Sequence, residues 1–270
     1  MSDSDQDTAR KRAHMPEGTD AVLNTRSLHG AHKRLAELLT PGMAVLDVGC
    51  AMGAITHGIA EAVGPTGSVI GLDANEALIA EAWRLHGDTP CLAFEAGDVY
   101  HLPYKDSYDI VTAARVLQWL ADPALALRQM AAAVRKGGRI VVLDYNHEKI
   151  VWSPEPPSSM RSFYSAFLRW RAEAGMDNAI ADNLAALFAA AGLRNTRHTV
   201  QHEHTRRGDP DFSTRIALWA HVAHTRGHQM VADGLLSEAK RAAAEQEYRV
   251  WAETDAQSQT LYLLCVEGVR

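Results

Sequence analysis

The stretch VLDVGCAMGAIT, residues 45–56, constrains the fold of this chain more than any other part. Its apolar start has the composition of a buried strand, and the segment after Gly53 has helical periodicity. Gly49 stands between them, where a residue without a side chain permits a tight turn and the close approach of a ligand. This order predicts the first unit of an α/β sheet, with a binding site where the strand ends.

Strands and helices are predicted to alternate along the first half of the chain. We expect strands at residues 43–48, 68–72, 91–95, 108–114 and 139–143. We expect one or two helices at 22–39 and single helices at 53–63, 75–85 and 123–135. Helices placed between strands in this way imply right-handed crossovers, and therefore a parallel sheet with helices on both faces.

The regular alternation of strands and helices ends after Asp144. The elements expected there are a proline-rich loop at 151–159, helices at 160–174 and 183–191, a strand at 195–205, a helical insertion at 209–247 and a last strand at 259–266. The last strand must return to the first sheet, so residues 16–270 are expected to form a single domain, with lid elements at about 147–178 and 207–254. Residues 1–15 are polar and are expected to form a mobile tail.

Composition limits the functions that this chain can have. Hydrophobic residues make up 47% and charged residues 22%, as in an ordinary globular protein. A net charge of -6, without a dense Lys/Arg stripe, argues against a nucleic-acid partner. The N-terminus lacks the apolar core of a signal peptide, the apolar runs are too short to span a bilayer, and the three cysteines have no metal-type spacing. We therefore expect a cytoplasmic protein with no membrane partner.

Two classes of ligand compete for the turn after the first strand. A dinucleotide site requires G-x-G-x-x-G, whereas the spacing here is Gly49-x-Ala51-x-Gly53, and Asp47 would repel a pyrophosphate. A ligand with an ammonium and a sulfonium group, such as S-adenosylmethionine (SAM), suits this carboxylate better. The segment DVGCAMG resembles motif I of the class I SAM-dependent methyltransferases, D/E-x-G-x-G-x-G, and departs from it at Ala51, where the extra methyl group is expected to affect affinity. The alternative is a tight turn that binds no ligand.

Four further stretches resemble this family in the expected order: VIGLDAN, FEAGDVYHLPY, YDIVTAARVLQWLADP and RKGGRIVVLDYNH. The resemblance implies that Asp73 accepts the ribose hydroxyls. It also implies that Asp98 accepts a proton from the adenine amino group, with Val99 packed on the ring. The alternatives are structural, because Asp73 could cap the following helix and Asp98 could cap a turn.

The resemblance also implies a fold, a cofactor and an activity. The expected fold is a Rossmann-like, seven-stranded, mostly parallel sheet with helices on both faces, an antiparallel last strand and helical lid insertions. The expected activity transfers the methyl group of SAM to an acceptor by in-line displacement and gives S-adenosylhomocysteine (SAH), with no metal. The residues expected to bind the cofactor are Asp47, Gly49, Ala51, Gly53, Asp73, Ala74, Asp98, Val99, Ala114 and Arg115.

The acceptor is expected to bind at the ends of the fourth and fifth strands. His147 has the pKa range of a general base, and Tyr145 and Asn146 are expected to orient the acceptor; a loop histidine exposed to water is the alternative. Arg115 is expected to bind an anionic acceptor or the cofactor carboxylate, or to form a surface salt bridge. Arg26 and His29 are weaker candidates for contacts with either ligand.

The lid is rich in aromatic residues, which favours a small, partly apolar or aromatic acceptor. Trp119 and much of the lid set are also expected to serve as core. His221, His224 and His228 share one helix face, but an amphipathic lid explains them better than a metal site. A small-molecule methyltransferase is therefore predicted. The alternatives are a SAM-binding protein without catalysis and an NAD(P)-dependent oxidoreductase. The lid aromatics are Trp152, Phe163, Tyr164, Phe167, Trp170, Trp219 and Trp251.

Overall fold

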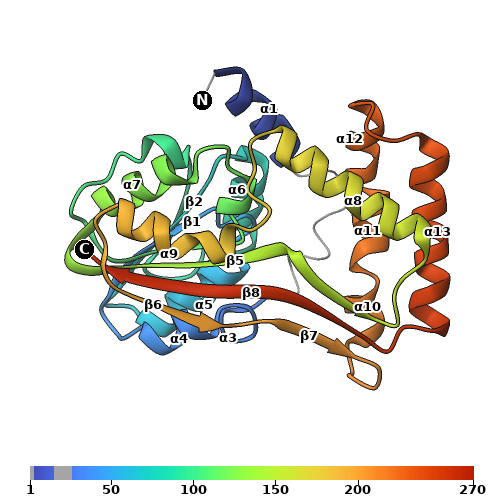
Figure 1. Cartoon of the computed structure of the whole chain (residues 1–270). Helices are drawn as coiled ribbons and strands as arrows, with labels where there is room; N and C mark the ends of the chain where they lie inside the picture. The colour runs from blue at the N-terminus through green and yellow to red at the C-terminus, as the bar shows by residue number, and fades with distance from the viewer. Residues whose placement is uncertain (1–2, 15–25) are drawn as a thin grey trace.

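The computed structural model describes residues 3–14 and 26–270, and its centre is one sheet (Figure 1). The strand order is β3-β2-β1-β4-β5-β8-β6, with β7 also paired to β8. Neighbours among β1 to β5 pair in parallel, whereas β8 runs antiparallel to β5, so the predicted α/β fold class is confirmed. The strands are β1 (Ala44–Val48), β2 (Ser68–Asp73), β3 (Leu92–Ala96), β4 (Tyr108–Ala114), β5 (Val134–Ser153), β6 (Arg194–Val200), β7 (Glu203–Arg206) and β8 (Ser258–Val269).

Alternating side chains give the sheet two apolar faces. In β1, Val45 packs into the core on one face, whereas Leu46 and Val48 pack into the core on the other. The strands read as continuous apolar runs because helices cover both faces. The first face is covered by α3 (Leu28–Ala31), α4 (Lys33–Leu38), α5 (Ala54–Val63) and α6 (Glu76–His86), and the second by α7 (Pro123–Ala133) and α9 (Ile180–Ala190).

The sheet has eight strands rather than the predicted seven, because the strand expected at 195–205 is divided into β6 and β7. The interruption lies at His202, whose Nδ1 is 3.0 Å from the carbonyl oxygen and 3.2 Å from the backbone nitrogen of Leu263 in β8. An imidazole that bonds to the neighbouring backbone takes the place of the regular ladder partner. The sequence pattern carries no signal for this substitution.

Long extensions of β5 and β8 carry the lid away from the body of the sheet (Figure 1). The fifth strand was predicted to end at residue 143, but it pairs with β8 as far as Asn146 and again from Val151 to Ser153. The lid helices bury Trp170, Trp219 and Tyr248 in a core of their own. These helices are α8 (Ser158–Glu173), α10 (Phe212–Ile216), α11 (Leu218–His224), α12 (Arg226–Ala232) and α13 (Glu238–Thr254).

The helical insertion predicted at 209–247 is broken into separate helices. Gly234, just after α12, has a φ of 76°, which ends a helix readily. Ser237 then caps α13, because its side chain accepts the backbone N–H of Lys240. A glycine stop followed by a serine cap therefore explains the break between α12 and α13.

Residues 3–13 form helix α1 (Asp3–Ala13), where a mobile tail was expected. Ala9 is buried, and the guanidinium of Arg12 donates to the backbone oxygen of Trp170 and to the carboxylate of Asp233. Contacts with the lid thus order a segment that is polar in sequence. Residues 1, 2 and 15 of the expected tail, and 22–25 of the first predicted helix, lie outside the described residues. No helix in the described part of the chain is long and apolar enough to cross a membrane.

Candidate cofactor and acceptor site

A cavity of about 960 Å³ lies at the carboxyl ends of β1 to β5. The strand order reverses between β1 and β4, and open α/β sheets bind ligands at such a switch point. Helices α1 and α11 add walls to the cavity through Arg10 and Trp219. The predicted site residues that line it are Gly49, Ala51, Asp73, Ala74, Asp98, Val99, Ala114, Arg115, Tyr145 and His147.

The turn after β1 has the left-handed backbone conformation typical of glycine, even at Ala51, where the family motif has a glycine. Gly49 has a φ of 73°, and a Cβ at this position would collide with Val116. Ala51 also lies in the left-handed region, with a φ of 49°. That conformation costs an alanine about 1–2 kcal/mol. The residue that departs from the family pattern therefore keeps the glycine conformation under strain.

Asp73, at the end of β2, holds this turn in place. Its Oδ2 accepts the N–H of Ala51 at 2.9 Å, and its Oδ1 accepts the N–H of Asn75 at 2.9 Å. Asn75, rather than Asp73, caps α6 by accepting the N–H groups of Ala77 and Leu78. A carboxylate has more acceptor positions than these bonds use, so Asp73 can also accept a ligand hydroxyl.

Asp98, after β3, has both structural partners and a place on the cavity wall. Its Oδ1 accepts the N–H of Tyr100 at 2.9 Å, so it caps the short helix η1 (Val99–His101). Its Oδ2 accepts from Arg10 of α1 at 2.6 Å. Val99 is buried beside it. The turn-cap alternative is therefore correct for Oδ1, and Asp98 also lines the cavity.

Asp47, at the end of β1, is buried and lines a smaller pocket of about 40 Å³ next to the main cavity. Arg26 lines both. The hydroxyl of Thr56 donates to Asp47 Oδ2 at 2.7 Å, and no ion pair among the described residues involves Asp47. Burial raises the pKa of Asp47 to about 7, against the opposing effect of the Thr56 bond, and Asp73 raises it further. A buried carboxyl without a cation favours a ligand that brings one.

Asp47 lines only the smaller pocket, and two other predicted site residues, Gly53 and Asn146, line neither pocket. Gly53 has a φ of 81° and packs so closely on Phe94 that a Cβ would lie 2.6 Å from that ring, so its role is in packing. Asn146 is buried and donates to Asp182 of α9 at 2.8 Å. It occupies the opposite face of β5 from Tyr145 and His147, because successive side chains alternate along a strand.

Arg115 lies at the junction of β4, β5 and β7. Its Nε donates to the hydroxyl of Tyr145 at 3.0 Å, and its Nη2 donates to the carboxylate of Glu203 and to the backbone oxygen of Ala31. The Nη1 atom is buried without a partner among the described residues. Arg115 has a φ of 63°, which is a genuine outlier for a bulky residue. The predicted salt bridge exists, but its arginine is buried and its glutamate is half-buried.

His147 is not an exposed loop histidine. Its Nε2 lies 2.6 Å from Oε1 of Gln118, whose amide nitrogen donates to the backbone oxygen of Arg115. Because a carbonyl oxygen only accepts, His147 carries its proton on Nε2, and Nδ1 holds the free lone pair. Burial, assisted by the positive charge of Arg171, lowers the pKa of His147 well below its usual value, so the ring is neutral at physiological pH.

The family is decided by a match over more than half of the chain. A family model described as a methyltransferase domain matches residues 39–183. The chain belongs to this methyltransferase family. The predicted recognition of the family, the Rossmann-like fold and SAM as the cofactor are thereby confirmed.

Similar proteins support the same fold and family. The methyltransferase is 34% identical over 118 residues to a demethylmenaquinone methyltransferase of Lactococcus lactis, a match that covers 43% of this chain and 46% of that protein. It is 41% identical over 103 residues to an uncharacterized 37.1 kDa protein in a transposon of Streptomyces fradiae, covering 38% of this chain and 30% of that protein. The matches thus span less than half of these relatives. A putative methyltransferase from Bacillus halodurans has the same fold, with a TM-score of 0.58, 15% identity, and coverage of 88% of this chain and 97% of that one.

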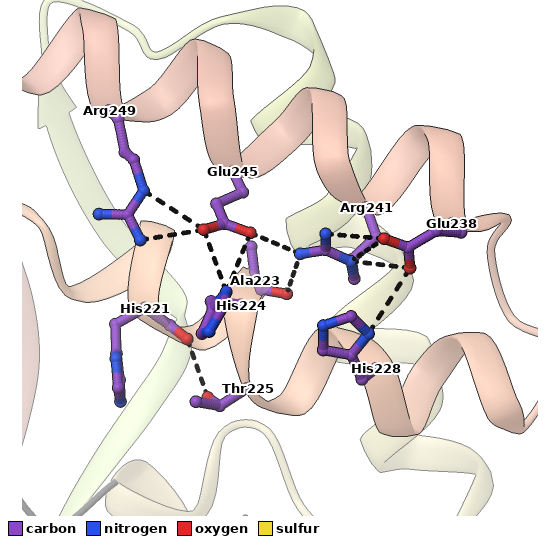
Figure 2. Close-up of polar contacts among 9 residues, drawn as sticks. All are labelled: His221, Ala223, His224, Thr225, His228, Glu238, Arg241, Glu245 and Arg249. Atoms are coloured by element: carbon purple, nitrogen blue, oxygen red, sulfur yellow. Dashed lines mark hydrogen bonds and ion pairs between the residues drawn. The ribbon is translucent and has the colours of Figure 1, made fainter. Parts of the chain in front are cut away.

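The lid histidines of the methyltransferase do not form a metal site. His224 and His228 point toward α13, where Nδ1 of His224 lies 3.2 Å from Glu245 and Nδ1 of His228 lies 3.6 Å from Glu238, and the ring of His221 lies apart from them (Figure 2). Arg241 joins the two carboxylates. No cluster of potential metal ligands occurs among the residues that the structure describes. These ion pairs connect α11 and α12 to α13.

Helix α1 and Arg226 also contribute to the cavity wall of the methyltransferase, which was not expected from the sequence. Arg226 donates to the backbone oxygens of Ala13 and His14, at 3.2 and 3.0 Å, and its guanidinium lies 4.2 Å from the ring centroid of Trp119. Trp119, expected to be core, therefore lies between the lid and the cavity. Only the spacing of Ala9 and Ala13, one helical turn apart, signals the inner face of α1.

Proposed function

We propose that this methyltransferase transfers the methyl group of SAM to a small-molecule acceptor by in-line displacement. The proposal rests on one observation. A single cavity runs from Asp73 and Asp98, at the carboxyl ends of β2 and β3, to Tyr145 and His147, at the end of β5. It can therefore hold a nucleoside at one end and a second ligand at the other.

At the Asp73 and Asp98 end of the cavity, a different residue can bind each part of SAM. Asp73 can accept the ribose hydroxyls, and Asp98 with Val99 can hold adenine. Asp47 can bind the ammonium group of the methionine tail, since it is buried without a cation. Arg26, which lines the pocket beside Asp47, and the free N–H groups at the start of α5 can bind the carboxylate of that tail. The role of each residue remains part of the proposal.

When bound, SAM supplies a methyl carbon whose bond to sulfur breaks as the acceptor atom bonds to that carbon, which leaves SAH. The chain contributes alignment, which can account for a large part of the rate of such a reaction. His147, held by Gln118 as a neutral imidazole with its lone pair on Nδ1, can take the acceptor proton if the acceptor carries one. Tyr145, also on the cavity wall, can orient the acceptor.

The size and walls of the cavity favour a small and partly apolar acceptor. Its volume is about 960 Å³, near the upper end of the range for small-molecule sites, and SAM would take a large share of it. Phe167 and Trp219 of the lid supply apolar wall at the second end. A macromolecular acceptor would need an open face there, and the lid occupies that position.

Methyl transfer can be tested with SAM that carries a labelled methyl group and a panel of phenols, amines and carboxylic acids. We expect label to reach at least one acceptor, with SAH formed in equal amount, and we expect Asp73→Asn to lower turnover by weakening SAM binding. Intact SAH binding without transfer to any acceptor would favour the alternative, a SAM-binding protein without catalysis. Binding of NAD in place of SAM or SAH would contradict the proposal as a whole.

A further inference from the structure

Acidic side chains gather at one end of the cavity, where Arg10 pairs with Asp98. The acidic residues of the cavity wall, Asp73, Glu76 and Asp98, all follow β2 or β3. At the second end, Arg115 lies on the wall with two neutral groups of β5, Tyr145 and His147. The acids match the cationic and hydroxyl-bearing parts of SAM, so the basic end is left for the other ligand.

Arg115 has donors that the protein does not use. Its side chain is only 4% exposed, yet Nη1 has no partner among the described residues, whereas Nε and Nη2 are both bonded. A buried N–H pair without a partner costs about 1–3 kcal/mol, and such groups are uncommon in native proteins. An acceptor group that takes these two N–H bonds would remove that cost.

The backbone at Arg115 is held in a strained conformation at the cavity wall. Its φ is 63°, and its N–H donates to the backbone oxygen of Leu143 in β5 at 2.7 Å. Residues in sparsely populated backbone regions are concentrated at ligand sites, where the surrounding structure over-determines them. The side chain itself is held by its bonds to Tyr145 and Glu203.

Two arginines, Arg26 and Arg115, lie near two acids, Glu203 and Asp144, at this end. Arg115 pairs with Glu203, but no ion pair among the described residues involves Arg26, which lines the same cavity. Burial lowers the pKa of Arg26, and the neighbouring positive charge of Arg115 lowers it further. If the cofactor carboxylate binds Arg26, the unused donors of Arg115 still favour one more anion.

We propose that the acceptor carries a carboxylate, which Arg115 binds through Nη1 while the apolar body of the acceptor packs against the lid. The apolar wall comes from Phe167, Leu218, Trp219 and Val222, which line the same cavity. A guanidinium is the side chain best matched to a carboxylate, because its planar donors form paired hydrogen bonds. This inference deepens the proposed function and rests on it.

The test compares carboxylates with their neutral carboxamides. Benzoate and phenylacetate, and then benzamide and phenylacetamide, are titrated into the full chain by calorimetry, with and without saturating SAH. We expect at least one carboxylate to bind about 10- to 100-fold more tightly than its amide. Arg115 is thereby assigned to the acceptor and not, as first expected, to the cofactor, so Arg115→Met should remove that preference while SAH still binds. Arg84→Met, the same substitution at an exposed arginine of α6, should keep the preference.

Loss of Arg115 leaves the half-buried Glu203 without its partner, so a second variant guards against misfolding. Arg115→Met combined with Glu203→Gln removes both charges, and it should bind SAH normally while showing no carboxylate preference. Equal binding of carboxylates and amides by the wild-type protein would overturn the inference, as would a preference that survives in the double variant. Loss of SAH affinity in both variants would also overturn it, because Arg115 would then hold the cofactor carboxylate. Carboxylate binding without any SAH binding would instead contradict the proposed function.

Discussion

Replacement of Asp47 with asparagine should change how the stability of the free protein depends on pH. Burial raises the pKa of this carboxyl from 3.8 to about 7, with the Thr56 bond opposing and Asp73 adding to the rise. In the unfolded chain the carboxyl ionises near pH 4, whereas in the folded protein it keeps its proton to about pH 7. The folded state therefore loses stability as the pH rises from about 4 to about 7, and this loss is complete above pH 7.

The size of the effect follows from the pKa difference. Each pKa unit corresponds to about 1.4 kcal/mol, so the ionised carboxyl of wild type costs about 4 kcal/mol above pH 7, of which about 2–3 kcal/mol appears between pH 5 and pH 8. Asparagine has no charge at either pH, and its oxygen can still accept the Thr56 hydroxyl. A buried amide N–H without a partner costs about 1–3 kcal/mol at both pH values, so it cancels in the comparison.

The assay is urea unfolding of the free protein at pH 5 and pH 8, followed by tryptophan fluorescence. The free energy of unfolding of Asp47→Asn, relative to wild type, should be about 2–3 kcal/mol higher at pH 8 than at pH 5. Asp88→Asn, the same change at an exposed position, should show no such difference. A relative stability of Asp47→Asn that is equal at the two pH values, or lower at pH 8, would refute the reasoning.

Two further substitutions test the turn and the acceptor end. Ala51→Gly removes the steric strain of an alanine in the left-handed conformation. After subtraction of the greater conformational freedom of glycine in the unfolded chain, the free energy of unfolding in urea should rise by about 0.5–1 kcal/mol. A loss of stability would contradict the strain at Ala51. His147→Ala should lower turnover of an identified acceptor about 10²–10⁴-fold, with SAH affinity retained in calorimetry. Unchanged turnover would remove His147 as the base.

The cofactor half of the site was predictable because it depends on local sequence. Apolar runs that end in Asp47, Asp73 or the residues after β4 mark buried parallel strands, and parallel strands bring their carboxyl ends to one edge. The positions of β1 to β4 therefore agree with prediction to within a residue or so. The left-handed backbone at Ala51 was not predictable, because the sequence shows a residue that avoids that conformation.

The acceptor half depends on contacts between distant residues, which a sequence pattern does not show. Arg115 meets Glu203 only because β7 folds back along β8, and α1 is ordered by Arg226 of the lid. Asn146 was expected in the cavity because it stands beside His147, but the continuation of β5 beyond its predicted end turns alternate side chains to opposite faces. Because the predicted end of β5 was too early, Asn146 was wrongly expected to share a site with Tyr145 and His147.

The central claim is that the cavity at the strand ends binds the SAM nucleoside through Asp73, while Asp47 in the adjoining pocket binds the methionine tail. Calorimetric titration of SAH into wild type, Asp47→Ala and Asp73→Ala tests it most directly, with NAD as the competing ligand. The account predicts that SAH binds wild type, that NAD does not, and that neither variant binds SAH measurably while its circular dichroism spectrum remains that of the wild type. Unchanged SAH affinity in both folded variants would contradict it.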